Sequence, residues 1–381
     1  MRKICILTGT RAEYGVLKPI IKAVDNNPLL ELSLVVTGMH LSQEFGYSFD
    51  EIKNDGFKIE GIVDMNPEDD TGISMAKSVG KGITGLSDVF EKIKPDILLI
   101  IGDRIEALAA AVAAAYMNII IAHISGGDVT RAGLDESVRH SITKLSHIHF
   151  PSTRTSESRV LKMGEDKWRV FRVGAPCLDT ILYERFLSRD ELNKKFNLEK
   201  NEDFIVLLQH SVTTQVEHAE NQIKETLEAI KELKIQTIAI YPNSDAGGRK
   251  IISKIKEYEK LPFIKSYKNL HQKDYFSLLK HARALVGNSS SGIIESSSFK
   301  LPVVNIGIRQ EGRERANNVI DAEHKKDKII QAIKKAFSEE FKKKLNYCVS
   351  PYGDGKTSQR ITKVLSEIDL NDNLLQKKIA Y

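Results

Sequence analysis

The chain has 381 residues, of which 28% are charged and 41% hydrophobic, and its formal net charge is +5. This composition is typical of a globular protein, and it excludes the fibrous, disordered and disulfide-stapled classes. Because the basic residues are mostly interleaved with acidic ones, the small positive excess does not indicate a nucleic-acid-binding protein.

The apolar segments are too short for export or membrane insertion. The N-terminal apolar run stops before Thr8, whereas a secretory signal needs an apolar core of about 7–15 residues. The most hydrophobic stretch, residues 107–122, falls short of the roughly 18 residues that a membrane span requires. Cys5, Cys177 and Cys348 form no CxxC pair, so they predict neither a zinc site nor a disulfide framework. We therefore expect a cytoplasmic protein without a membrane partner or a bound metal.

Short β-branched runs alternate with helical patterns through the first half of the chain. The predicted strands span residues 3–8, 32–37, 96–101, 119–124, 148–151 and 170–173. Helical patterns lie between them, among them residues 16–26, 105–117 and 136–146. The continuous apolar run at 97–101 indicates burial on both faces, which is typical of a parallel sheet covered by helices.

A polar stretch without a strand, residues 178–203, separates this series from a second one. Its predicted strands span residues 204–209, 237–241, 263–266, 284–286 and 303–306, with helices at 216–233, 251–258, 275–280 and 328–337. The alternation predicts an α/β protein with two doubly wound, Rossmann-like domains. We expect the domains at residues 1–177 and 178–357, with the helical segment 358–381 packing back on the first.

Unusual polar residues follow many of these strands, where ligands bind in open parallel sheets. In the first half the motifs are GTRAEYG after the first strand, GDR at 102–104 and SGGD at 125–128. In the second half they are PNSDAGG at 242–248 and GNSSSG at 287–292. The candidate site residues are Arg11, Asp103, Arg104, Asp128, Asp135, His210, Asn243, Ser289, Ser290, Glu295, Arg309 and Arg313.

Several of these candidates also have a purely structural interpretation. The serines of GNSSSG can cap a helix, or they can hold a diphosphate at the positive end of the helix dipole. Three serines exceed what one cap requires, which favours phosphate binding. Arg11 can form a surface ion pair, Asp103 and Arg104 can pair with each other, and His210 can be a buried core histidine.

Taken in order, the motifs resemble those of the UDP-N-acetylglucosamine 2-epimerases across residues 3–321. The matching motifs are GTRAEYG, TGMH, GDR, HISGGD, DESVRHSITKLSH, HSVTT, PNSDAGG, GNSSSG and RQEGR. The resemblance implies the two-domain GT-B fold, with a UDP-sugar held in the cleft between the domains. It also implies an enzyme without a cofactor that forms a homodimer or homotetramer.

The motifs are closer to one of the two branches of this family. Non-hydrolysing members carry a QHR motif belonging to an allosteric substrate site, and this chain has Met39, His40 and Leu41 there. The hydrolysing branch, which releases UDP and a free mannosamine-type sugar for sialic-acid-like pathways, is the closer match. Its members often read HIEGGE where this chain reads HISGGD, so Ser125 stands where a carboxylate is usual and Asp128 replaces the second glutamate.

The resemblance implies that UDP-GlcNAc and water are converted to ManNAc and UDP by elimination through 2-acetamidoglucal and rehydration. General acid–base groups and stabilisation of the leaving diphosphate are what such a reaction needs. The implied carboxylates are Asp103, Asp128 and Asp135, with their acid and base roles open, and His210 assists the leaving group. The implied substrate ligands are Arg11, Arg104, Asn243, Ser289, Ser290, Glu295, Arg309 and Arg313.

Four alternatives remain at this point. One is the same reaction on a UDP-2,4-diacetamido-2,4,6-trideoxy-glucose. We expect Ser125 and the segments 130–134 and 39–42 to determine which of the two UDP-sugars is the substrate. A second is non-hydrolysing epimerisation, which the missing QHR motif disfavours. The others are a GT-B glycosyltransferase, which needs an acceptor, and a sugar-nucleotide-binding module without turnover.

Overall fold

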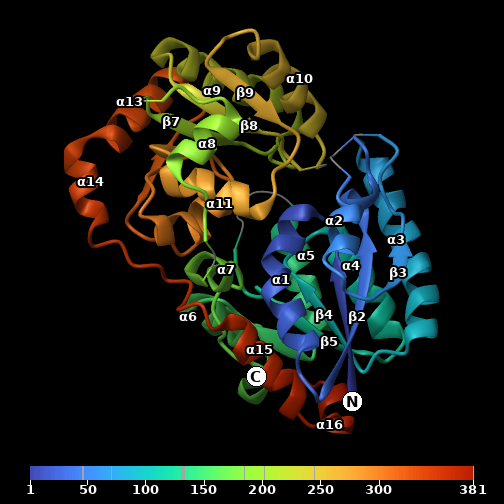
Figure 1. Cartoon of the computed structure of the whole chain (residues 1–381). Coiled ribbons are helices and arrows are strands. Elements are labelled where there is room, and N and C mark those ends of the chain that lie inside the picture. Colours follow the sequence, from blue (N-terminus) through green and yellow to red (C-terminus); the bar gives the residue numbers. More distant parts are fainter. Residues whose placement is uncertain are drawn as a thin grey trace. The chain divides into compact units, whose positions relative to one another are not determined.

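The computed structural model describes residues 1–44, 47–69, 71–129, 134–183, 185–200, 202–243 and 245–380. The chain divides into two compact units, each built on its own sheet (Figure 1). The first unit contains Met1–Val129, Leu134–Leu182 and the C-terminal segment from Tyr352 onward. The second unit contains Tyr183–Pro351.

The first unit has a six-stranded parallel sheet in the order β3-β2-β1-β4-β5-β6. Its strands are β1 (Arg2–Thr8), β2 (Leu30–Thr37), β3 (Ile59–Val63), β4 (Ile97–Ile101), β5 (Ile120–Ile124) and β6 (Ile148–Phe150). Its helices are α1 (Arg11–Asp25), η1 (Gly38–Leu41), α2 (Phe49–Asn54), α3 (Gly72–Ile93), α4 (Ile105–Tyr116), α5 (Asp135–Leu145), α6 (Arg154–Lys162), η2 (Lys167–Arg169), α7 (Cys177–Tyr183), α15 (Thr357–Glu367) and α16 (Asp372–Leu375). This strand order is that of the Rossmann fold.

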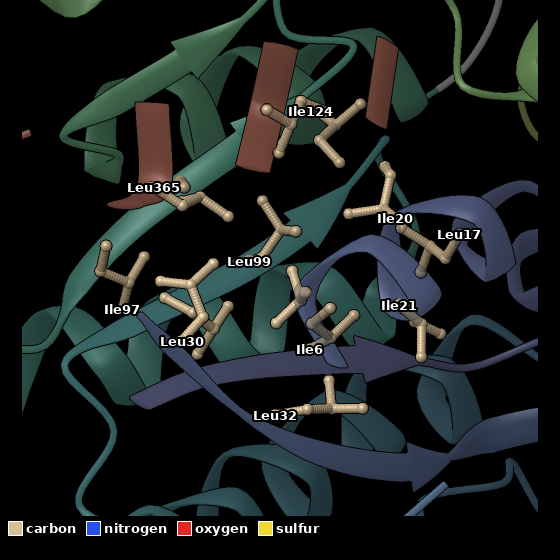
Figure 2. Close-up of a cluster of buried hydrophobic side chains, with 14 of the residues drawn as sticks. Ile6, Leu17, Ile20, Ile21, Leu30, Leu32, Ile97, Leu99, Ile124 and Leu365 are labelled. Atoms are coloured by element: carbon tan, nitrogen blue, oxygen red, sulfur yellow. The ribbon is translucent and has the colours of Figure 1, made fainter. Parts of the chain in front are cut away.

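Alternate residues of the central strands enter separate apolar clusters on the two faces of this sheet. Ile6 and Leu99 lie in the cluster formed with α1 and α15, where Leu365 contributes from the C-terminal segment (Figure 2). Leu7 and Leu98, one position away, lie in the cluster formed with α3 and α4. Burial of both faces explains the continuous apolar strands, because every side chain of such a strand has a covered environment.

The second unit repeats this topology, with its six parallel strands in the order β12-β11-β10-β7-β8-β9. Its strands are β7 (Phe204–Leu208), β8 (Gln236–Ile240), β9 (Ile264–Tyr267), β10 (Ala284–Gly287), β11 (Val303–Ile306) and β12 (Val319–Ala322). Its helices are α8 (Arg189–Phe196), η3 (Val216–His218), α9 (Ala219–Leu233), α10 (Gly248–Tyr258), α11 (Gln272–His281), α12 (Ser291–Ile294), η4 (Ser296–Phe299), α13 (Lys326–Phe337) and α14 (Glu339–Leu345).

Two doubly wound α/β sheets were predicted, and the structure confirms them. The predicted strand at residues 170–173 is wrong, because that segment contributes only an isolated bridge between Val170 and His149. Strands β3 and β12 were missed, and both lie at the edge of a sheet. Edge strands are covered less completely, so their mixed sequences IEGIV and VIDA lack the continuous apolar pattern of the central strands.

Candidate active site

The side chain of Arg139 joins the loops that follow β4 and β5. Arg139 lies in α5 and is only 2% exposed. Its Nη2 forms an ion pair with Asp103 Oδ2, and its Nη1 donates to the backbone carbonyl of Asp128 at 3.0 Å. A buried charge is tolerated when it is paired and hydrogen-bonded. One guanidinium thus links the loops of Asp103 and Asp128 to the helix that begins at Asp135.

The loop from Ser125 to Asp128 has a strained backbone. Ser125 has φ +62° and Gly127 has φ +78°, a left-handed region that is costly for a residue with a side chain. A Cβ at Gly127 would overlap the carbonyl of Ser156. The Asp128 side chain accepts a hydrogen bond from Ser156 Oγ, and Ser125 Oγ lies 3.4 Å from Ser152 Oγ. Strain of this kind is concentrated at functional sites, which supports the assignment of this loop to a site.

The two arginines predicted to bind anions in the first unit both contact carboxylates. Arg11 Nε donates to Glu51 Oε2 at 2.6 Å. Arg104 approaches the Glu106 carboxylate with two nitrogens, each at 3.1 Å. A phosphate that binds Arg11 or Arg104 must therefore compete with a glutamate for the guanidinium.

A carboxyl group and a histidine that are not among the candidate site residues lie near the ends of β1 and β2. Burial raises the pKa of Glu13 to about 8, and the neighbouring Glu106 adds to the shift. His40 lies between Thr8 Oγ1 at 3.0 Å and Ser48 Oγ at 2.7 Å. Burial also lowers the pKa of His40 to about 3. At neutral pH the His40 ring is therefore uncharged, and much of Glu13 is protonated.

In the second unit, His210 contacts two other strand-end segments. Its ring Nδ1 accepts the backbone N–H of Asn243 at 3.2 Å, and its own backbone N–H donates to Asn288 Oδ1 at 2.7 Å. These residues follow β8 and β10, the neighbours of β7 in the sheet. The structure thus brings the candidates His210 and Asn243 together, and it adds Asn288.

The GNSSSG loop opens a very short helix. Helix α12 has four residues before it passes into the 3-10 turn η4, so its dipole is weaker than that of a long helix. Ser290 is at the N-cap position, and within the described residues its side chain makes no capping hydrogen bond. Ser289 Oγ accepts the N–H of Ser291 at 3.3 Å.

Glu295, the predicted ribose ligand, is nearly buried and accepts a hydrogen bond from Ser291 Oγ. Arg309, after β11, donates through Nη1 to the carbonyl of Asn288 at 3.3 Å. Arg313 is partly buried in the following turn. Arg309 therefore lies against the GNSSSG loop.

The sequence analysis gave no site role to Arg139, Asn288 or Glu13, although each lies in one of the quoted motifs. Arg139 stands four residues after Asp135, a spacing that places both on one face of a helix, and this signal was available. Asn288 stands directly after β10 but was treated only as part of a phosphate-binding loop. The burial of Glu13 depends on contacts with residues distant in sequence, such as Glu106, which no local pattern reveals.

The described residues contain no arrangement of three or more His, Cys, Asp or Glu side chains that could hold a metal ion. Within the same residues, no helix is both long and apolar enough to cross a membrane.

The two sheets define the fold class of the protein. A solved structure with a similar fold is the UDP-GlcNAc 2-epimerase of Methanocaldococcus jannaschii in complex with UDP-GlcNAc and UDP. It matches with a TM-score of 0.79 and 22% sequence identity, over 96% of this chain and 99% of that one. The chain therefore has the two-sheet GT-B type of fold.

Sequence comparison then gives the family. Residues 22–366 match the model of the UDP-N-acetylglucosamine 2-epimerase family. A UDP-N,N'-diacetylbacillosamine 2-epimerase (hydrolyzing) from Legionella pneumophila is 41% identical over 100% of both chains. A UDP-N-acetylglucosamine 2-epimerase from Neisseria meningitidis is 33% identical over 89% of this chain and 88% of its own. The chain belongs to the UDP-N-acetylglucosamine 2-epimerase family, and the resemblance seen in the sequence motifs is confirmed.

Proposed function

We propose that this chain is a hydrolysing 2-epimerase, and that its substrate is UDP-N,N'-diacetylbacillosamine, a UDP-2,4-diacetamido-2,4,6-trideoxy-glucose. The observation that carries the proposal is the 41% identity to the hydrolysing Legionella pneumophila relative over the full length of both chains. The products are UDP and the free sugar with inverted configuration at C2.

UDP-N-acetylglucosamine is the second candidate substrate, which would give free ManNAc and UDP. The Neisseria meningitidis relative, 33% identical, supports it. The two sugars differ at C4 and C6, whereas the chemistry at C1 and C2 is the same. The reaction mechanism is therefore common to both candidates.

The reaction proceeds in two stages. A base removes the C2 proton while the C1–O bond breaks, its electron pair leaves with UDP, and a C1=C2 double bond forms. Water then adds its oxygen to C1, and C2 receives a proton on the opposite face. Both stages need positioned acid–base groups, and the first needs stabilisation of the departing diphosphate.

Asp103 is the carboxylate to which we assign proton transfer at C2. Its side chain is partly exposed, whereas Asp128 is buried and accepts a hydrogen bond from the Ser156 hydroxyl. Asp128 and Asp135 are the candidates for the second acid–base group. His210 donates to the leaving diphosphate, while Ser289, Ser290 and Arg309 bind its oxygens and Glu295 accepts from the ribose.

The function is tested by incubating the protein with each UDP-sugar in D₂O enriched in ¹⁸O, without an acceptor. We expect free sugar with deuterium at C2, together with UDP that contains no ¹⁸O, because the C1–O bond and not a P–O bond breaks. UDP-N,N'-diacetylbacillosamine should give the higher kcat/KM. A UDP-sugar epimer as the only product, or no reaction without an acceptor, would overturn the proposal.

Replacing Ser290 by alanine should raise KM about tenfold with kcat little changed. The lost hydrogen bond to a charged phosphate is worth about 1.5–3 kcal/mol, and it is made equally in the ground and transition states. Steady-state kinetics on Ser290→Ala and on Ser298→Ala, a control in the 3-10 turn η4, would measure this. A lost kcat with an unchanged KM would contradict a simple phosphate contact.

A further inference from the structure

The backbone of His210 is held at both of its polar groups by one side chain. Asn288 Oδ1 accepts the N–H of His210 at 2.7 Å, and Asn288 Nδ2 donates to the carbonyl of His210 at 2.9 Å. Because the backbone N–H can only donate and the carbonyl can only accept, the orientation of the amide is fixed by chemistry. Asn288 is 1% exposed, so water does not compete for these two bonds.

The histidine ring is held as well. The backbone N–H of Asn243 donates to His210 Nδ1 at 3.2 Å, so Nδ1 must be the unprotonated nitrogen. The proton of the neutral ring therefore lies on Nε2. This contact needs a fixed backbone at His210, because a small rotation of the backbone would move Nδ1 away from a donor on another loop.

The carbonyl of Asn288 is a further point of attachment. It accepts from Arg309 Nη1 at 3.3 Å and from Gln310 Nε2 at 2.9 Å. Asn288 also begins the loop that carries Ser289 and Ser290. A single buried residue thus connects the histidine, the arginine and the phosphate-binding serines of this unit.

We infer that Asn288 is a positioning residue that holds His210 with its Nε2–H directed to act as donor to the leaving diphosphate. The inference rests on the proposed function for the identity of the reaction. It adds a residue to that function, because Asn288 itself contacts no reacting atom and acts through His210. Fixed orientation of a donor is a large part of its effect on a transition state, and small misplacements are costly.

The test compares Asn288→Ala, Asn288→Asp and a matched control, Asn305→Ala. Asn305 is another buried asparagine of the same unit, on β11, and its Nδ2 donates to Asp321 Oδ1 at 2.8 Å. Asn288→Ala should lower kcat by roughly 10–100-fold, within the range of acid–base contributions, with the Kd for UDP changed less than about threefold. Asn305→Ala should lower Tm without lowering kcat.

The pH dependence of the activity of Asn288→Asp distinguishes a positioning role of Asn288 from a general structural defect. A protonated carboxyl has the shape of the amide and can make both bonds to His210, whereas a carboxylate faces the carbonyl of His210 without a proton to donate. The activity of Asn288→Asp relative to the unsubstituted protein should therefore rise as the pH falls. The relative activity of Asn288→Ala should stay constant with pH.

The tautomer of His210 is measured independently of turnover by long-range ¹H–¹⁵N NMR, with the His210 signal identified by its loss in His210→Gln. The unsubstituted protein should show Nε2–H, and Asn288→Ala should show a mixture of tautomers. Failure of the unsubstituted protein to cleave either UDP-sugar would overturn the proposed function and leave this measurement valid. An Asn288→Ala protein with an unchanged kcat, or an unchanged His210 tautomer, would overturn the inference.

Discussion

Replacing Asp103 by asparagine is expected to lower kcat by at least about a hundredfold, in line with acid–base contributions of about 10²–10⁴. The amide keeps the size of the side chain but cannot take up a proton from C2. Because binding of UDP is assigned to residues of the second unit, the Kd for UDP should change little. Pre-steady-state measurement of UDP release reports the effect on the chemical step. Calorimetric titration with UDP reports the effect on the Kd.

The contact between Asp103 and Arg139 makes a stability control necessary. Asp103→Asn removes a charge that Arg139 contacts, and breaking a buried pair by removing one partner destabilises a protein by about 3–5 kcal/mol. Thermal unfolding must therefore show that the variant is folded at the assay temperature. Asp88→Asn, at an exposed position of α3, provides a matched control with a full kcat. A folded Asp103→Asn protein with a near-normal kcat would remove Asp103 from the mechanism.

The fold was predictable because its signals are local. Buried parallel strands such as β4 are continuous apolar runs, and the residues that follow them must lie at one edge of the sheet. This is how Asp103, Asp128 and His210 could be chosen without a structure. The predicted strands other than 170–173 are present, with ends shifted by no more than two residues.

The contacts within the candidate site were not predictable from the same signals. The sequence places Asp103 beside Arg104, whereas the structure has Asp103 contact Arg139 and Arg104 contact Glu106. Neighbouring residues at a strand end point in different directions, so Asp103 contacts a residue of α5 that is distant in sequence, whereas Arg104 contacts the first turn of α4. Helix α12 is short because the SSSF segment after it forms the 3-10 turn η4, a change of helix type that the sequence pattern does not indicate.

A second large effect is expected for Glu165, a buried carboxylate to which the proposed mechanism gives no role. Its side chain is 0% exposed and accepts from Lys144 at 2.6 Å, from His149 at 2.9 Å and from Lys377 at 3.1 Å. Lys377 also donates to the carbonyl of Ser146 at 2.7 Å, directly after α5. Glu165 therefore ties the C-terminal segment to the helix that carries Asp135 and Arg139.

Glu165→Gln should lower the free energy of unfolding by about 3 kcal/mol, because it leaves the Lys377 ammonium, whose side chain is only 13% exposed, without its carboxylate. Urea denaturation at pH 7 measures this, with Glu91→Gln on the exposed face of α3 as the control. The loss should appear as a lower transition midpoint with an unchanged m value. An unfolding midpoint equal to that of Glu91→Gln would show that the interactions of the Glu165 carboxylate contribute nothing to stability.

The pH dependence of stability distinguishes a charge effect from lost packing. Burial alone would raise the pKa of Glu165, but hydrogen bonds from His149 and Lys144 outweigh burial and lower the pKa to about 2 from its ordinary 4.5. The stabilisation is therefore complete above about pH 4.5 and is lost as the pH falls toward 2. Burial also lowers the pKa of His149, so protonation of its ring below its ordinary pKa destabilises the folded state in the same direction. The free energy of unfolding of the unsubstituted protein should fall more steeply on acidification than that of Glu165→Gln. Parallel curves of unfolding free energy against pH for the two proteins would mean that Glu165 acts through its shape and not its charge.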